Sequence, residues 1–148
     1  MMKNFDVVET EFTSDPISDA VSVNPDVVVV AIGEEPYTEK PGDIRTLQLP
    51  SSQMDLVREL RASLPETKIV AVYVGGRPRL LGDIVENVDA FVATFLPGPS
   101  GGEAISNALL GIFNPSGRLP LSWPKFADGG RRTHDSFVTD LCTKSQNS

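Results

Sequence analysis

The sequence predicts an α/β fold with an open, mostly parallel β-sheet. Three segments, residues 25–33, 68–76 and 89–98, are nearly continuously apolar and rich in β-branched residues. Runs of this kind are typical of strands that are covered on both faces. Segments with helical periodicity lie between them, and this alternation is typical of βαβ units with right-handed crossovers. We therefore expect helices on both faces of the sheet, in a three-layer sandwich.

The first part of the chain carries two further patterns. Residues 4–12 (NFDVVETEF) predict an additional strand. Residues 14–23 (SDPISDAVSV) predict a short helix, in whose first turn Pro16 is tolerated.

A longer helix is expected over residues 51–65, between the first two apolar strands. Ser52 and Asp55 resemble a capping box at its start, and Pro65 ends it. Four apolar side chains share one face of this helix: Leu56, Val57, Leu60 and Leu64.

Three elements are expected in the remainder of the chain. Residues 79–88 (RLLGDIVENV) predict a short helix, and residues 101–111 predict another that Gly111 ends. Residues 117–123 (GRLPLSW) predict a short extended piece, which Pro120 excludes from the centre of a sheet. From residue 126 to residue 148 the sequence is polar and without period, so we expect an irregular, disordered tail.

Composition argues against several classes of function. The formal net charge is −7, and no stripe of Lys and Arg is present, which disfavours nucleic acid and anionic membranes as partners. No apolar run is long enough to span a bilayer, and the first residues lack the apolar stretch expected of a signal peptide, so the compartment is left open. The single cysteine, Cys142, forms no internal disulfide. The spacing of His, Cys and carboxylates predicts no metal site, and no cofactor is expected.

Three unusual loops follow the three apolar strands: residues 33–43, 75–79 and 98–102. Ligands of open parallel sheets collect at this edge, although glycines after strands are also common simply because tight turns need them. Residues 98–102 lack the Gly-Lys-Ser/Thr of a phosphate loop, which leaves a nucleotide-binding function as a minor alternative.

The first loop (AIGEEPYTEKPGD) carries three carboxylates. A carboxylate in a loop is more often solvated than catalytic. Glu39 improves on that expectation through its setting, because Pro36 and Pro41 stiffen the loop and Tyr37 lies beside it, so this carboxylate could be held in place. Glu34 follows the strand directly and is expected to act as a hydrogen-bonding brace. Glu35 is expected to be exposed.

The ordered motifs resemble a known family. VVAIGEEPYTEKPGDIRTLQLP, SSQMDLVRELR, KIVAVYVGGRPRLL and DAFVATFLPGPSGGEAISNALLGIFNPSGRLPLSWPK together resemble the C-terminal α/β-sandwich domain of family 3 glycoside hydrolases, the β-glucosidases and β-glucan exohydrolases. We assign this domain to residues 1–125, with the best match over 25–125. PYTEKPGD is similar to the exohydrolase branch.

The resemblance implies a retaining glycosidase acting on terminal β-linked glucosides or β-glucans. In the family a (β/α)8 barrel supplies an aspartate nucleophile, and this domain lends the general acid/base glutamate from a loop over the active site. The motif places that glutamate at Glu39, with Glu34 as second candidate. Tyr37, Asp43 and Arg77 fall on motif positions for which we expect roles in the substrate loop or in shaping the loops.

The chain is too short for the barrel, which alone needs about 200 residues. We therefore expect a fragment, missing its first strand, that needs a barrel in cis or in trans and presents an apolar face where that barrel docks. Because retaining hydrolysis requires two carboxyl groups about 5 Å apart, the isolated chain is expected to be inactive. The alternative is a non-catalytic α/β module that binds a sugar or a protein.

Overall fold

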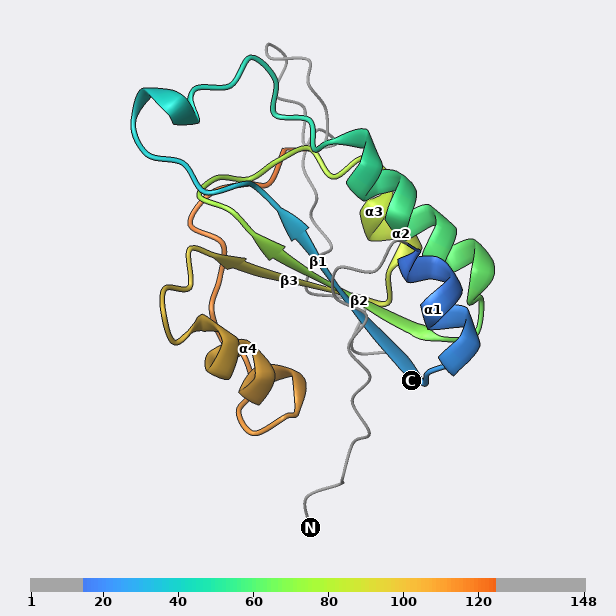
Figure 1. Ribbon diagram of the computed structural model, residues 1–148. Coiled ribbons are helices and arrows are strands. Elements are labelled where there is room, and N and C mark those ends of the chain that lie inside the picture. The colour runs from blue at the N-terminus through green and yellow to red at the C-terminus, as the bar shows by residue number, and fades with distance from the viewer. Residues whose placement is uncertain (1–14, 125–148) are drawn as a thin grey trace.

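The computed structural model describes residues 15–124, and a parallel β-sheet lies at its centre (Figure 1). The strands are β1 (Val27–Gly33), β2 (Lys68–Val74) and β3 (Ala90–Phe95), in the order β1-β2-β3. Both strand pairs are parallel, and Val27 lies opposite Lys68 at the start of the first pair. The expected α/β class and the three apolar strands are confirmed. The strand expected over residues 4–12 and the tail expected from residue 126 lie outside the described residues.

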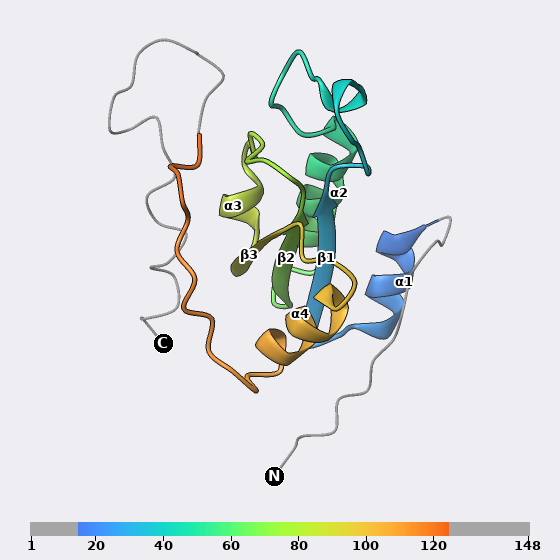
Figure 2. The same ribbon diagram turned by 90° about the vertical axis from the view of Figure 1, so that its left-hand side faces the viewer.

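Helices lie on both sides of this sheet (Figures 1 and 2). Three of them, α1 (Pro16–Val23), α2 (Ser51–Ser63) and α3 (Ile84–Asn87), lie on one face, and α4 (Gly101–Leu109) lies on the other. The crossovers from β1 to β2 and from β2 to β3 both run over the same face. Helices on one face are the consequence of right-handed connections between strands that follow each other in one direction across a sheet. None of the helices within residues 15–124 has the length and apolar character needed to cross a bilayer.

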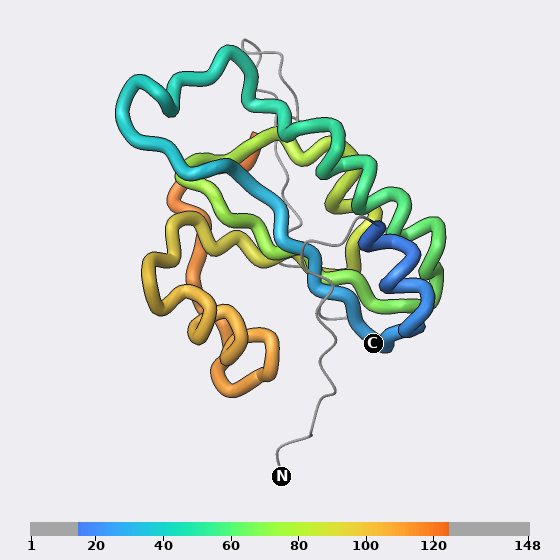
Figure 3. Tube along the Cα trace, in the orientation of Figure 1, coloured from blue at the N-terminus to red at the C-terminus, as the bar shows by residue number. Residues whose placement is uncertain are grey.

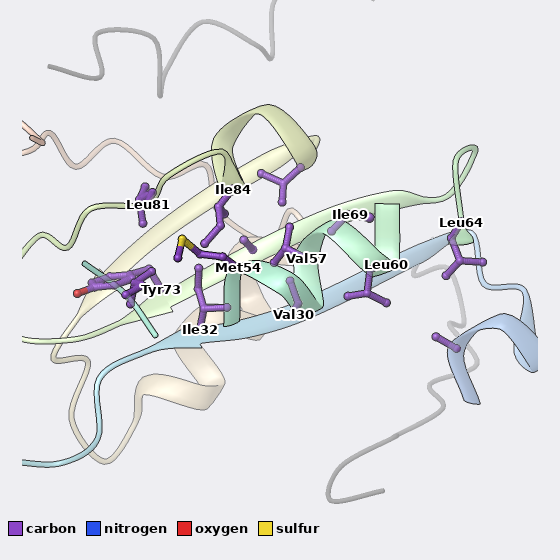
Figure 4. Close-up of a cluster of buried hydrophobic side chains, with 14 of the residues drawn as sticks. Val30, Ile32, Met54, Val57, Leu60, Leu64, Ile69, Tyr73, Leu81 and Ile84 are labelled. Atoms are coloured by element: carbon purple, nitrogen blue, oxygen red, sulfur yellow. The ribbon is translucent and has the colours of Figure 1, made fainter. Parts of the chain in front are cut away.

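The hydrophobic core lies between the sheet and α2 (Figure 4). Alternate strand residues point toward the helix, and the helix residues that meet them are one turn apart. Full burial of a Val, Leu, Ile, Phe or Met side chain contributes about 1.5–3 kcal/mol to the stability of the fold. The central members are Val30, Ile32, Ile69, Ala71, Tyr73, Met54, Val57 and Leu60.

The opposite face of β1 is open. Val27 and Val29 are 50% and 52% exposed, whereas Val30 on the core side is 7% exposed. The helix on this side, α4, buries only Gly101 among its residues. The prediction that the first apolar run is covered on both faces is therefore wrong for β1 in the described structure.

Two helix predictions need correction. The helix expected over residues 79–88 begins only at Ile84, because Gly82 has a positive φ of 58° and Leu80 forms a parallel bridge with Gln48. The capping box of Ser52 is also absent: Pro50 is the N-cap of α2, no side chain caps it, and Ser52 lies inside the helix. The expected C-terminal stop of α4 is confirmed, since Gly111, with a φ of 70°, follows the C-cap residue Leu110.

Candidate functional site

Three loops meet at the edge of the sheet where the parallel strands end. The longest, residues 34–50, leaves β1, stands away from the body of the domain and returns at the start of α2 (Figure 3). It contains the 3-10 turn η1 (Lys40–Gly42). The loops after β2 and β3 lie beside its base, as expected for consecutive parallel strands.

Gly33 fixes the point where the long loop leaves the sheet. Its φ of 149° is one that side-chain-bearing residues rarely adopt, and an added Cβ would lie 1.8 Å from the carbonyl oxygen of Val74. The Gln53 side chain pairs with the Gly33 backbone, accepting from its N–H at 2.9 Å and donating to its carbonyl at 3.0 Å. The start of α2 therefore holds the exit of β1, a role for Gln53 that the sequence pattern did not indicate.

Glu34 is a buried, ion-paired carboxylate. Its side chain is 4% exposed, and its Oε1 lies 2.7 Å from Arg79 Nη1 and 3.1 Å from Arg77 Nε. The Tyr37 hydroxyl donates to Oε2 at 3.1 Å. Burial pushes the pKa of Glu34 up, but the hydrogen bonds from Arg79 and Tyr37 and the two guanidinium charges outweigh burial, so the pKa is lowered. Glu34 is thus held as an anion that accepts hydrogen bonds.

Arg79 ties the returning limb of the long loop to the sheet edge. Its Nε donates to the Leu47 carbonyl at 2.8 Å, and its Nη2 donates to the Gln48 carbonyl. Its own carbonyl accepts from the buried Trp123 indole at 2.7 Å. Sequence reasoning singled out only Arg77, yet the two arginines stand two residues apart in the extended GRPRL segment, a spacing that places both on one side.

Arg77 contacts the middle of the long loop. Its Nη2 donates to the Gly42 carbonyl at 2.6 Å, and its guanidinium carbon lies 4.3 Å from the centre of the Tyr37 ring. Tyr37 itself is 37% exposed. Arg77 therefore connects Glu34, Tyr37 and Gly42, which are spread over nine residues of the loop.

Glu39 lies in the projecting part of the long loop, immediately before η1. It is exposed, and its side chain makes no hydrogen bond or ion pair with any other residue of the described range 15–124. Its backbone has φ 56° and ψ −140°, a combination that is sparsely populated for residues with a side chain. Such backbone persists only where its surroundings impose it, and it clusters at functional sites.

The remaining predicted residues are placed differently. Asp43 is exposed, and within residues 15–124 only its backbone is engaged, its N–H donating to the Lys40 carbonyl at 2.9 Å. Glu35 is exposed, as expected. The structure thus brings Glu34, Tyr37 and Arg77 together and leaves Glu39 and Asp43 facing outward. In the described part of the chain, no group of His, Cys, Asp and Glu has an arrangement that could hold a metal ion.

Comparison with protein families gives one match that covers most of the chain. Residues 6–147 match the glycosyl hydrolase family 3 C-terminal domain. The chain is 42% identical over 120 residues to a lysosomal beta glucosidase of Dictyostelium discoideum, covering 79% of this chain and 14% of that protein. It is 39% identical over 101 residues to a periplasmic beta-glucosidase of Salmonella typhimurium, covering 68% and 13%.

A solved structure shows the same fold. The beta-glucosidase of Listeria innocua, crystallised with gluconolactone, superimposes with a TM-score of 0.69 and 29% sequence identity, covering 78% of this chain and 16% of that one. The chain therefore spans about a seventh of the length of the curated relatives it matches.

Proposed function

Because the chain belongs to glycoside hydrolase family 3, as a C-terminal domain of that family, we propose that it supplies the general acid/base of a retaining β-glycosidase. The substrate is a terminal β-linked glucoside or a β-glucan. The observation that carries this proposal is the contrast between two carboxylates on one loop. Glu39 projects from the sheet edge, and its side chain bonds to no residue within 15–124, whereas Glu34 is buried between two arginines.

The contrast supports Glu39, rather than Glu34, as the acid in this proposal. A general acid must reach the leaving oxygen and must carry a proton near neutral pH. The pKa of Glu34 is lowered, and its oxygens already accept hydrogen bonds, so it does not suit this role. Glu39 is free to enter another domain's active site. A buried setting beside an ionised nucleophile is what favours the protonated form of a general acid.

The reaction needs a second carboxylate from a partner. In retaining hydrolysis one carboxylate, the nucleophile, attacks the anomeric carbon while the other, the acid/base, protonates the leaving oxygen. The acid/base carboxylate later deprotonates the water that releases the sugar. We propose that a (β/α)8 barrel, on the same chain or on another, provides the nucleophile and the sugar subsites. The 148 residues alone are expected to hydrolyse no aryl β-glucoside, because both carboxylates must act in one constellation.

The test assembles this domain with a family 3 barrel, in cis or in trans, and compares Glu39→Gln with Glu35→Gln. The two glutamates share the loop and are both exposed, so Glu35 is a matched control. We expect Glu39→Gln to lower kcat on an unactivated β-glucoside by about 10²–10⁴-fold and Glu35→Gln to leave it unchanged. Added azide should restore turnover of the Glu39 variant on an activated aryl glucoside, giving the β-glucosyl azide.

Two results would contradict the proposal. If Glu39→Gln retains the wild-type rate in the assembled enzyme, the acid lies elsewhere. If the isolated chain hydrolyses an aryl β-glucoside and loses this activity on Glu39→Gln, no barrel is required.

A further inference from the structure

The segment that carries Glu39 is closed on itself. The N–H of Gly42 donates to the Glu39 carbonyl at 2.9 Å, and Gly42 lies so close to Tyr37 that an added Cβ would be 2.3 Å from the ring atom Cδ2. Residues 37 and 42 therefore meet, and Glu39 stands on the turn between them.

A single side chain from another loop contacts both ends of this turn. Arg77 follows β2, and its guanidinium group lies over the Tyr37 ring at 4.3 Å. The same group donates to the Gly42 carbonyl at 2.6 Å. A planar guanidinium can stack on a ring and donate from its edge simultaneously, which an ammonium group cannot do.

Arg77 is itself held in place. Its Nε lies 3.1 Å from the buried Glu34 carboxylate, and its carbonyl accepts from the buried Tyr73 hydroxyl at 2.5 Å. Gly76 permits the close approach, because an added Cβ there would lie 2.5 Å from the Tyr37 hydroxyl oxygen. The contact between Arg77 and the turn is therefore supported from the sheet side.

We propose that Arg77 is a positioning residue for Glu39: it holds the two ends of the turn 37–42 together and so fixes the direction of the Glu39 side chain. This inference rests on the proposed acid/base role of Glu39. Arg77 itself touches no reacting atom and acts through the turn. The unusual φ and ψ of Glu39 fit this role, since such backbone is retained only under an imposed constraint.

If Arg77 holds the two ends of the turn 37–42 together, replacing it should loosen this turn in the isolated chain. Arg77→Lys is the first variant, because it keeps a positive charge beside Glu34 while losing the stacked and edge contacts. We expect the amides of Gly42 and Asp43, which close the turn, to exchange with solvent about tenfold faster. The amide of Val72 in β2 should be unchanged. Arg77→Met should give the same pattern, and Arg58→Lys, which alters a remote arginine paired with Asp83, should give none.

The assembled enzyme supplies a kinetic readout that a general loss of structure would not give. A glycoside with a poor leaving group needs the proton of Glu39, whereas a 2,4-dinitrophenyl glucoside does not. We expect Arg77→Lys to lower kcat/KM on the first about tenfold or more, since small misplacements of a reacting group are costly. The activated substrate should change by no more than about threefold.

The outcomes separate this inference from the proposed function. If the amide hydrogens of Gly42 and Asp43 exchange at the wild-type rate in Arg77→Lys, Arg77 does not hold the turn, and the positioning role fails independently of the result for Glu39→Gln. Equal loss on both substrates, with Glu39→Gln showing the leaving-group dependence, overturns the positioning role while leaving the acid assignment intact. If Glu39→Gln shows no such dependence, the proposed function fails, and the positioning role fails with it.

Discussion

At the scale of single residues, the site depends on close approaches that only small or planar groups allow. Gly33 brings its backbone against Val74, and Gly42 brings its backbone against the Tyr37 ring. The guanidinium groups of Arg77 and Arg79 donate hydrogen bonds to the Glu34 carboxylate. The long loop is consequently held by backbone contacts and ion pairs at its base, and only its outer part is free to project.

Gly33→Ala is expected to destabilise the domain by about 3 kcal/mol, because the new Cβ would collide with backbone in a positive-φ position. Gly102→Ala is the control. Gly102 lies in α4, and apart from its chain neighbours and the helix's own backbone, no atom of residues 15–124 lies within 4 Å of an added Cβ. Alanine should therefore leave stability unchanged or raise it by about 0.5–1 kcal/mol. Urea denaturation followed by circular dichroism measures both. Equal stability of Gly33→Ala and the wild type would show that this contact is not needed.

At the scale of elements, the Asp89 carboxylate connects α2, β2 and β3 at the end of the sheet away from the candidate site. Asp89 precedes β3, and its Oδ2 lies 2.5 Å from Arg61 Nη2 in α2 and accepts the Ile69 N–H of β2 at 2.9 Å. Lys68 Nζ lies 3.0 Å from the other oxygen. Burial alone would raise the pKa of Asp89, but the Ile69 N–H, Lys68 and Arg61 together lower it to about 2.

The lowered pKa gives a prediction for stability against pH. Since the folded pKa of Asp89 is about 2 and the unfolded value is 3.8, its contribution is complete above pH 3.8 and is lost as the pH falls toward 2. Asp89→Asn should cost on the order of 1 kcal/mol at pH 7, a value reduced by the solvent exposure of the carboxylate. The variant and the wild type should converge near pH 2.

Asp55→Asn provides the control for this experiment, because Asp55 pairs with Arg58 on the solvent-exposed side of α2. Its effect at pH 7 should be under about 0.5 kcal/mol. Denaturation curves at several pH values report both variants. A constant difference between Asp89→Asn and the wild type from pH 7 to pH 2 would refute the assignment.

Element positions were largely predictable from sequence, and element ends were less so. The β-branched runs located β1 and β2, because strands of a parallel sheet that pack against helices are nearly continuously apolar. The start of α2 at Ser51 agrees with the predicted segment, but its capping residue was predicted wrongly, because Ser52 offered a local capping pattern that the chain does not use. The contact between Arg79 and Trp123 was not predictable, since 44 residues separate them and no local pattern pairs them.

At the scale of the whole molecule, the two faces of the sheet are unequal. The face toward α2 is closed, whereas Val27 and Val29 on the α4 side remain about half exposed. Further apolar side chains are exposed on α4 and in the segments next to it: Leu96, Leu109, Leu110, Ile112 and Phe113. Apolar surface gathered on one side of a domain is typical of regions that contact other protein surfaces.

The double variant Val27→Thr, Val29→Thr tests this asymmetry in the isolated chain. We expect the wild type to bind the apolar dye 8-anilinonaphthalene sulfonate and to self-associate at high concentration, and the double variant to do both less. Its free energy of unfolding should change by no more than about 0.5 kcal/mol per substitution. Val30→Thr, on the closed face, should instead cost about 1–3 kcal/mol. Equal dye binding by the wild type and the double variant would contradict the prediction.

The position of Trp123 gives this protein an internal optical probe. It is the only tryptophan in the chain, it is 1% exposed, and its ring packs edge-on against Tyr73 at 5.2 Å and Phe91 at 5.6 Å. Its indole N–H is bonded to the backbone of Arg79, whose side chain holds Glu34. Its fluorescence therefore comes from one dry environment next to the base of the Glu39 loop. A red shift of that emission would signal that the base has opened, without any label and without any substrate.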